Sequence, residues 1–254
     1  MSPKVSIILP TYNRCQFLPQ AIESVLRQTF KDFELIIIND GSSDNTENVV
    51  KNISDPRIKY FKNNQNLGIQ KTLNIGLARS RGKYIARIDD DVEWINPDKL
   101  KKQVDFLEKN PEYVLVGTFG IIEKNGKQKF WKLPEEDEKI RKNILAKNCF
   151  IHFSVVFRKD IALEVGGYDK SELTQYAEDY NLWLRFGQKG KFANLPFFSV
   201  KFQVSEEQIS TKKRMEQLKN TLLIAKKYKK YYPGYYKALI KHYMKIFLAY
   251  THLW

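Results

Sequence analysis

The sequence predicts an α/β fold: a mostly parallel central sheet covered by helices on both faces, with a helical appendage at the C-terminal end. Apolar runs typical of buried strands alternate with segments of helical period through the first half of the chain. These strand runs are almost continuously apolar, as strands of a doubly covered parallel sheet are. Two helical segments, separated by Pro233-Gly234, follow at the end and predict the appendage.

The first half supplies the parallel strands and their connecting helices. Strands are expected at 4–10, 33–39, 58–61 and 83–88, and helices at 16–28, 44–54 and 66–80. In the first helix, apolar residues recur at helical spacing, and Asp44 is a suitable cap for the second. The crossovers between the strands should be right-handed.

The second half is less regular. A long strand is expected at 113–123, followed by a hairpin turn at Asn125-Gly126, with shorter strands at 153–158 and 191–203. Helices are expected at 135–147, 178–187, 205–231 and 234–251, and another should start near Pro97-Asp98. We divide the chain into an α/β domain at 1–204 and a helical extension at 205–254.

Composition narrows the class of protein. The chain has 254 residues, 43% hydrophobic and 28% charged, enough for one sizeable core. No apolar run reaches the roughly 18 residues of a spanning helix, and no signal-peptide pattern precedes the first strand. Cys15 and Cys149 fit no zinc or redox spacing. We therefore expect a protein of the reducing cytoplasm.

The charge is unevenly distributed. The net charge is +14, and residues 205–254 alone contain eleven Lys or Arg and three Glu. Such a basic extension predicts an anionic partner, which could be lipid headgroups, nucleic acid or a charged polymer.

Three consecutive aspartates, Asp89, Asp90 and Asp91, close the predicted strand at 83–88 and are the most informative motif. Carboxylates crowded at a strand end repel one another, and a divalent cation such as Mg²⁺ or Mn²⁺ relieves the repulsion. The alternative interpretation is an acidic turn before the next helix.

Other polar groups should meet these aspartates. The loop Pro10-Thr11-Tyr12-Asn13, the pair Asp40-Gly41 and the segment 66–68 all lie at or beside strand ends, where open α/β sheets bind ligands. Neither a G-x-G-x-x-G nor a P-loop motif occurs. Tyr12 could stack on a base and Asp40 could accept a hydrogen bond from a base or a ribose. A nucleoside diphosphate with a divalent cation would satisfy all these groups.

Several motifs, in one order, resemble the family 2 inverting glycosyltransferases of bacterial polysaccharide and glycolipid synthesis. They are VSIILPTYNR at 5–14, SVLRQT at 24–29, NDGS at 39–42, ARSRGKY at 78–84, the aspartates at 89–91, VGGYD at 165–169 and AEDYNLWLR at 177–185. The resemblance covers about residues 4–210. It implies the GT-A fold, a Rossmann-like α/β/α sandwich, and transfer of a sugar from a nucleotide donor, usually UDP-linked, to an acceptor hydroxyl.

The resemblance also implies roles for particular residues. The donor would be bound by Pro10, Thr11, Tyr12, Asp40, Asn66, Gly68, Arg81, Asp89 and Asp90. Asp91 would bind the Mn²⁺ or Mg²⁺ ion that bridges the diphosphate. Asp179 would be the general base, with His152 and Glu178 as candidates on the acceptor side. The acceptor itself would be a glycan or a lipid-linked sugar.

Two departures from the family pattern concern the metal. Val92 stands where many relatives have a further acid, and Ser205 stands where many have a histidine. Water, Glu206, Glu207 or a lysine of the extension could complete the metal or diphosphate contacts instead.

Two other functions fit parts of the sequence. A sugar-phosphate nucleotidyltransferase can share the fold, but the loop at 10–14 lacks the glycines that such enzymes use. A nucleic-acid-binding protein would explain the lysines and tyrosines at 226–232, although no binding motif accompanies them and we expect no nucleic acid.

The last helix has two stripes. Tyr236, Leu239, Ile240, Tyr243, Phe247 and Tyr250 follow helical spacing, and Lys237, Lys241 and Lys245 form a separate row. A basic amphipathic helix of this kind can lie in an anionic membrane surface, which would hold the protein at the inner face of the membrane. In the alternative, the apolar stripe packs on the catalytic domain and the lysines are solvated.

Overall fold

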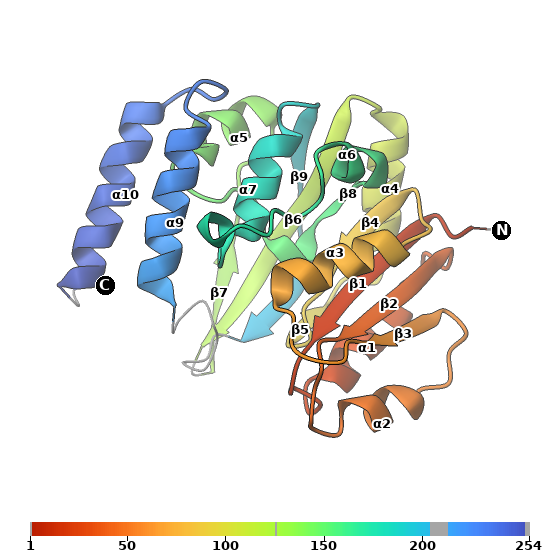
Figure 1. Ribbon diagram of the computed structural model, residues 1–254. Helices are drawn as coiled ribbons and strands as arrows, with labels where there is room; N and C mark the ends of the chain where they lie inside the picture. The colour runs from red at the N-terminus through yellow and green to blue at the C-terminus, as the bar shows by residue number, and fades with distance from the viewer. Residues whose placement is uncertain (1, 125, 204–212, 252–254) are drawn as a thin grey trace.

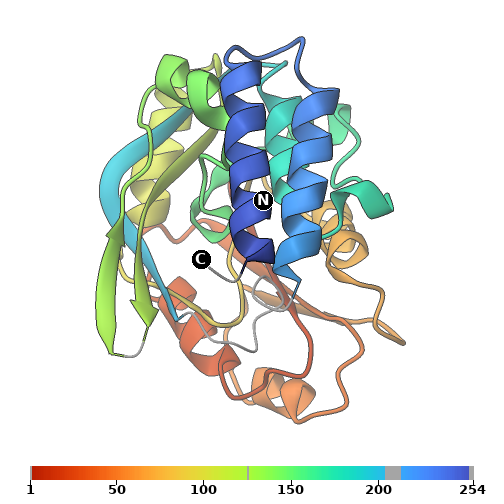
Figure 2. The same cartoon turned by 90° about the vertical axis from the view of Figure 1, so that its left-hand side faces the viewer.

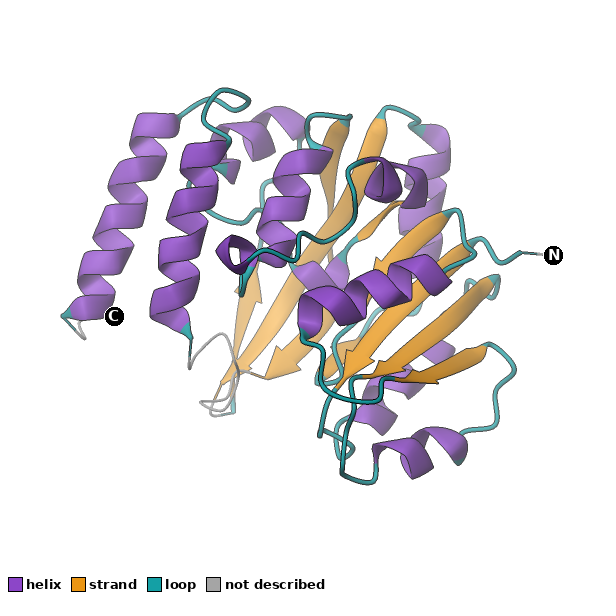
Figure 3. Cartoon of the chain, viewed as in Figure 1, coloured by secondary structure: helices purple, strands orange, loops and turns teal. Residues whose placement is uncertain are grey.

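The computed structural model describes residues 2–124, 126–203 and 213–251. The chain forms a twisted sheet with helices on both faces (Figures 1 and 3). The strands are β1 (Val5–Thr11), β2 (Phe33–Asn39), β3 (Ile58–Lys62), β4 (Tyr84–Arg87), β5 (Val92–Trp94), β6 (Tyr113–Lys124), β7 (Lys127–Trp131), β8 (Val156–Arg158) and β9 (Lys191–Gln203). The helices are α1 (Leu18–Leu26), α2 (Thr46–Lys51), α3 (Ile69–Arg79), α4 (Lys99–Lys109), α5 (Asp137–Ile144), α6 (Lys159–Glu164), α7 (Glu178–Phe186), α9 (Arg214–Lys227) and α10 (Tyr235–Tyr250). Two short 3₁₀ helices, η1 (His152–Ser154) and η2 (Glu172–Thr174), complete the described part.

All strands of the described residues belong to one sheet. Their order is β3-β2-β1-β4-β8-β6-β9-β5, with β7 paired to β6. The first four strands of the chain pair in parallel, as the alternating pattern predicts, and so do β6 and β9. Strands β5, β7 and β8 pair antiparallel to their neighbours.

Apolar side chains fill both faces of the sheet, which explains why the strand runs lack a polar alternation. In β1, Val5, Ile7 and Leu9 face one apolar cluster, which α1 and α4 cover. Ile8 faces the other cluster, which is covered by α3, α5, α7 and the C-terminal helices. This three-layer arrangement confirms the predicted fold class.

The C-terminal helices pack on the rest of the molecule (Figure 2). Ile224, Tyr228 and Tyr232 belong to the same apolar cluster as α7. The Tyr232 hydroxyl donates to Leu184 O at 2.7 Å, and His242 Nε2 lies 2.8 Å from Leu145 O. Within the described residues, no helix is both long and apolar enough to cross a membrane.

Several predicted elements need correction. The segment at 153–158 is not one strand, because η1 takes its first residues and β8 begins only at Val156. Strand β5 and helix α6 were not predicted, and both are too short to give a clear period. Helix α9 begins at Arg214 in the structure, and residues 205–212 of the predicted helix lie outside the described part, as does Asn125 of the hairpin turn.

Candidate active site

The carboxyl ends of β1, β2 and β4 bring the predicted donor residues to one edge of the sheet. Thr11 and Asn39, the last residues of β1 and β2, pair with each other, and Asp40 N donates to Thr11 O at 2.9 Å. Strand β4 runs parallel to β1 and ends at Arg87, so the aspartates at 89–91 emerge at the same edge. The predicted convergence of these segments is therefore confirmed.

The loop after β1 presents an aromatic ring. Pro10 and Thr11 are buried, whereas Tyr12 is 44% exposed. Asn13 has a positive φ of 52°, and its N–H donates to Ser42 Oγ at 2.9 Å, which fastens the loop to the segment after β2. The backbone is thus fixed while the Tyr12 ring remains available to a ligand, although its stacking on a base stays a prediction.

Asp40 organises the loop before α3. Its Oδ1 accepts from Asn63 Nδ2 at 2.8 Å and from Leu67 N at 2.9 Å, and its Oδ2 accepts from Gly68 N at 3.0 Å. Asn66 Oδ1 accepts from the same Gly68 N at 3.0 Å. Gly68 has a φ of +85°, which favours glycine, and open space lies beside its α-carbon. Asp40 therefore shapes the loop, and its contact with a base or ribose stays a prediction.

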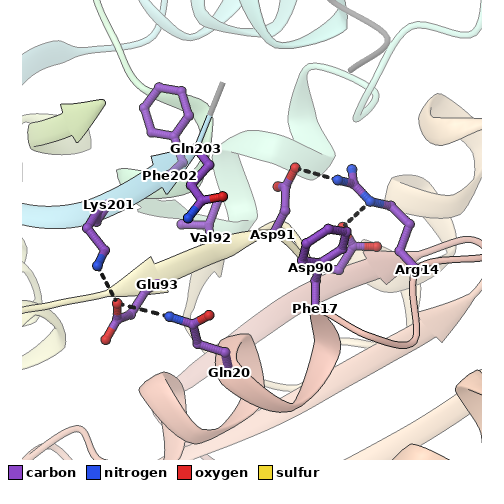
Figure 4. A pocket seen from close by; sticks show the side chains of 10 residues that line it. All are labelled: Arg14, Phe17, Gln20, Asp90, Asp91, Val92, Glu93, Lys201, Phe202 and Gln203. Atoms are coloured by element: carbon purple, nitrogen blue, oxygen red, sulfur yellow. Dashed lines mark hydrogen bonds and ion pairs between the residues drawn. The ribbon is translucent and has the colours of Figure 1, made fainter. Parts of the chain in front are cut away.

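The three consecutive aspartates meet two different arginines. Asp89 binds the buried Arg87 through two bonds, Nη1 to Oδ2 at 3.0 Å and Nη2 to Oδ1 at 2.7 Å. Arg14 lies against the other two, with Nε 3.6 Å from Asp90 Oδ1 and Nη2 2.9 Å from Asp91 Oδ2 (Figure 4). Burial raises the pKa of Asp90 to about 7, although the nearby Arg14 opposes the shift.

The carboxylates at this edge are suitable ligands for Mg²⁺ or Mn²⁺. In the described ranges, no group of three or more His, Cys, Asp or Glu side chains is arranged to hold a metal. Mg²⁺ commonly needs only one or two carboxylates when substrate phosphates supply further ligands. Asp90 and Asp91 already attract a cationic group, Arg14, so this site fits a metal that arrives with a diphosphate.

The structure describes one of the two departures from the family pattern, Val92. Val92 is buried in the apolar core at the start of β5, so it supplies no ligand. Ser205, Glu206 and Glu207 lie outside the described residues. Their proposed parts in metal or diphosphate binding stay predictions.

A second polar cluster surrounds Asp179 in the first turn of α7. Asn148 Nδ2 donates to Asp179 Oδ2 at 2.7 Å, and Tyr180 N donates to Oδ1 at 2.6 Å. His152 Nδ1 lies 4.0 Å from Asp179 Oδ2, while its Nε2 is 3.0 Å from the Tyr168 hydroxyl. The structure thus brings together Asp179 and His152, which the sequence separates by 27 positions.

Burial determines the protonation of this cluster. It raises the pKa of Asp179, which the Arg87 charge and the Asn148 hydrogen bond partly oppose. It lowers the pKa of His152 well below its ordinary value, so His152 is neutral near pH 7. A carboxylate with a raised pKa beside a neutral imidazole is suited to accept a proton.

Arg87 links the two groups of carboxylates. Arg87 is buried, with only 3% of the residue exposed, and its guanidinium binds Asp89. Its charge also acts on Glu178 and Asp179, whose pKa values it lowers against the effect of burial. A single buried arginine therefore couples the strand-end aspartates to the acidic turn of α7.

Glu178 is buried, and its Oε2 lacks a hydrogen-bond partner among the described residues. Burial, with the neighbouring Asp179 charge, raises the Glu178 pKa to about 7. Between the ordinary pKa of about 4.5 and pH 7, the folded state binds more protons than the unfolded state, so stability falls as the pH rises.

We expect Glu178→Gln to be about 1–3 kcal/mol more stable than wild type at pH 8, because the amide cannot ionise. Below pH 4.5 the difference should vanish. Urea unfolding at both pH values measures it. An equal difference at the two pH values would mean that Glu178 is not the titrating group.

One predicted donor residue lies elsewhere. Arg81 precedes β4 and binds Glu34 near the start of β2, with Nη2 2.9 Å from Oε2. Arg81 N also donates to Glu34 Oε1 at 2.8 Å, beside the buried Ser6 of β1. These contacts are at the amino ends of the strands, opposite the aspartates. Arg81 therefore does not line the donor pocket, and that prediction is wrong.

The structure adds residues that the sequence interpretation did not select. Arg14 and Arg87 bind the aspartates, Asn148 binds Asp179, and Tyr168 contacts His152. Arg14 and Arg87 do have a sequence signal, since Arg14 is the last residue of the motif at 5–14 and Arg87 lies two positions before Asp89. Asn148 has none, because it reaches Asp179 only through the turn that follows α5.

Comparisons with known proteins identify the family of the chain. The sequence profile described as "Glycosyl transferase family 2" matches residues 6–164. The putative glycosyltransferase EpsE of Bacillus subtilis is 35% identical over 218 residues, which cover 84% of this chain and 76% of EpsE. The UDP-Glc:alpha-D-GlcNAc-diphosphoundecaprenol beta-1,3-glucosyltransferase WfgD of Escherichia coli is 34% identical over 214 residues, which cover 84% of this chain and 81% of WfgD.

The fold has solved counterparts as well. The mannosyltransferase PcManGT of Pyrobaculum calidifontis, solved in complex with GDP-Man and Mn²⁺, superposes with a TM-score of 0.68 at 16% identity. The match covers 96% of this chain and 74% of that structure. The fold is the GT-A fold, and the matching profile is that of a glycosyltransferase family. The chain belongs to glycosyl transferase family 2.

Proposed function

We propose that the enzyme transfers a sugar from a nucleoside diphosphate donor, preferably UDP-linked, to a hydroxyl group of a glycan or lipid-linked acceptor, with inversion at the anomeric carbon. The observation that carries this proposal is the pair of acidic centres, Asp89, Asp90 and Asp91 on one side and Asp179 on the other, joined through Arg87. The name of WfgD, a relative that uses UDP-Glc and a lipid-linked acceptor, supports the choice of substrates.

The strand-end loops would bind the donor. The exposed Tyr12 ring would stack on the base, and Asp40 with the Asn66 and Gly68 loop would contact base and ribose. Asp89, held by Arg87, would contact the ribose or the transferred sugar. Catalysis is assigned to residues 1–204.

Asp179 would remove the proton of the attacking hydroxyl. Asn148 and Tyr180 N fix its carboxylate, and the neighbouring His152 and Glu178 would be on the acceptor side. A base on one face and the leaving diphosphate on the other permit a single displacement, which inverts the anomeric carbon.

A divalent cation would be held by Asp91, with Asp90 beside it, and Mn²⁺ in PcManGT supports this cofactor. When bound, the cation would stabilise the negative charge that develops on the leaving diphosphate.

Incubation of the protein with a panel of nucleotide sugars tests the proposal. With Mn²⁺ present, release of UDP from UDP-Glc or UDP-GlcNAc should exceed release of GDP from GDP-Man, and UDP should raise the melting temperature. If the protein releases no UDP and no nucleotide raises its melting temperature, the proposal is wrong.

We also propose that α10 holds the enzyme on an anionic membrane, which residues 205–254 would contact. Six apolar or aromatic side chains of α10 are more than half exposed: Tyr236, Ile240, Tyr243, Met244, Phe247 and Tyr250. The helix instead buries Ala238 and His242 against the domain. The apolar stripe that could have packed on the domain therefore faces outward.

Lysines border this apolar face on both sides. Lys226 of α9 donates to the Tyr243 hydroxyl at 3.1 Å, and Lys219 lies 5.8 Å from the centre of the Tyr250 ring. On the other side, Lys237 and Lys241 are exposed. Aromatic side chains between lysines suit the interface of a membrane with anionic headgroups.

Sedimentation with phosphatidylglycerol-containing vesicles tests this attachment. Wild type should pellet at low salt, and Lys237→Gln/Lys241→Gln should bind roughly 30-fold more weakly, because each lysine near the surface contributes about 1 kcal/mol. The double variant Lys59→Gln/Lys109→Gln removes the same charge from β3 and α4, far from α10 in Figure 1, and should bind like wild type. If wild type stays in the supernatant at low salt, whatever its oligomeric state, the proposal is wrong.

A further inference from the structure

Arg14 lies where a cation would otherwise neutralise the aspartates. Its Nη2 is 2.9 Å from Asp91 Oδ2 and its Nε 3.6 Å from Asp90 Oδ1. Figure 4 shows Arg14 at one side of the pocket, with its guanidinium directed toward these two carboxylates. The guanidinium thus places one positive charge beside two adjacent carboxylates, where a divalent cation would place two.

The backbone below Arg14 is fixed, whereas its side chain can move. Asn13 N donates to Ser42 Oγ at 2.9 Å and Cys15 N to Asp44 Oδ2 at 3.0 Å, so both neighbours of Arg14 are tied to the segment after β2. The Arg14 side chain is one-third exposed, and its guanidinium lies 5.0 Å from the centre of the Phe17 ring. It can turn toward solvent or a ligand without a change in the loop.

Two other cations in or beside the pocket, Lys201 and Arg27, are directed to a different carboxylate. Glu93 lies 3.3 Å from Lys201 Nζ and 3.4 Å from Arg27 Nη2, and it accepts from Gln20 Nε2 at 3.2 Å. These groups satisfy Glu93, one strand position beyond Val92. Arg14, by contrast, is directed at Asp90 and Asp91 from the loop that also carries Tyr12.

We infer that Arg14 occupies the place of the divalent cation in the free enzyme, so that cation and nucleoside diphosphate bind together. The inference rests on the proposed function, in which Asp91 holds the metal. A cation that enters alone must displace the guanidinium and leave it without its anionic partners. When the diphosphate enters as well, its oxygens offer Arg14 a new and stronger partner.

This exchange makes two binding events cooperative. The free enzyme should bind Mn²⁺ weakly, and UDP should strengthen Mn²⁺ binding by the same factor by which Mn²⁺ strengthens UDP binding. Arg14 is thus a positioning residue, because it acts through the carboxylates and the diphosphate rather than on the reacting carbon. It also protects the enzyme from holding metal without a donor.

Calorimetry with Mn²⁺ alone tests the first part. Arg14→Gln should bind Mn²⁺ about tenfold more tightly than wild type, since one charge-assisted competing contact is removed. Arg27→Gln is the matched control: it removes the same charge from a position beside the pocket, where the lost partner is Glu93, and should leave Mn²⁺ affinity unchanged. Arg14→Lys keeps the charge without the two-point contact and should lie between wild type and Arg14→Gln.

Titration with UDP tests the second part. The factor by which UDP tightens Mn²⁺ binding should shrink in Arg14→Gln and persist in Arg27→Gln. If Arg14→Gln and Arg14→Lys bind Mn²⁺ no more tightly than wild type, the inference is wrong, even where UDP and Mn²⁺ bind cooperatively. Failure of the proposed function gives a different result, because then UDP does not bind wild type with or without Mn²⁺.

Discussion

Asparagine in place of Asp179 is expected to lower turnover by roughly 10²–10⁴-fold, the usual weight of a general base, with little change in UDP affinity. The amide keeps the size of the carboxylate and can still meet Asn148 and Tyr180 N. It cannot take the proton of the acceptor hydroxyl. Measurements of kcat for transfer and of the UDP dissociation constant separate these two effects.

The neighbouring Glu178 provides the control for this experiment. Glu178→Gln removes a carboxyl group one residue away that burial keeps largely protonated up to about pH 7, so its effect on turnover should be smaller. If Asp179→Asn retains near-wild-type transfer while Glu178→Gln loses it, the base is Glu178. The raised pKa of Asp179 also implies that turnover of wild type declines on the acid side at a higher pH than an ordinary aspartate would allow.

The edge of the sheet at which the donor residues meet could be predicted because it follows from strand direction alone. In parallel strands, residues that follow the carboxyl ends of β1, β2 and β4 must emerge on one side. Asp40 and the aspartates at 89–91 satisfied that condition. Arg81 did not, since it stands before β4, and motif resemblance assigned it to the pocket against that geometry.

The partners within the site could not be read from the sequence. Asp179 meets Asn148 and His152 because the turn after α5 and the short helix η1 fold back against α7. No period or spacing encodes that packing. The outward orientation of the apolar stripe on α10 was equally undetermined, because helical spacing defines a stripe but not which stripe faces the protein.

Alanine in place of Asp91 is expected to abolish the Mn²⁺-dependent part of UDP binding. Coupled ligands commonly strengthen each other by about 5–150-fold, and this gain should disappear in Asp91→Ala. The reason is that Asp91 lies 2.9 Å from the Arg14 guanidinium at the strand end, where a cation between protein and diphosphate would sit. Affinity for UDP without metal should change little, since Tyr12 and the Asp40 loop remain.

Calorimetry with UDP, in Mn²⁺ and in a metal chelator, gives the gain for each variant. Glu93→Ala is the matched control. It also removes a carboxylate from this pocket, but Lys201 and Arg27 already neutralise that carboxylate, so the variant should keep the gain. A full Mn²⁺-dependent gain in Asp91→Ala would exclude Asp91 as a metal ligand. Asp90, buried beside it with a pKa near 7, would then be the next carboxylate to test, and its contribution should increase as the pH rises through 7 and the group ionises.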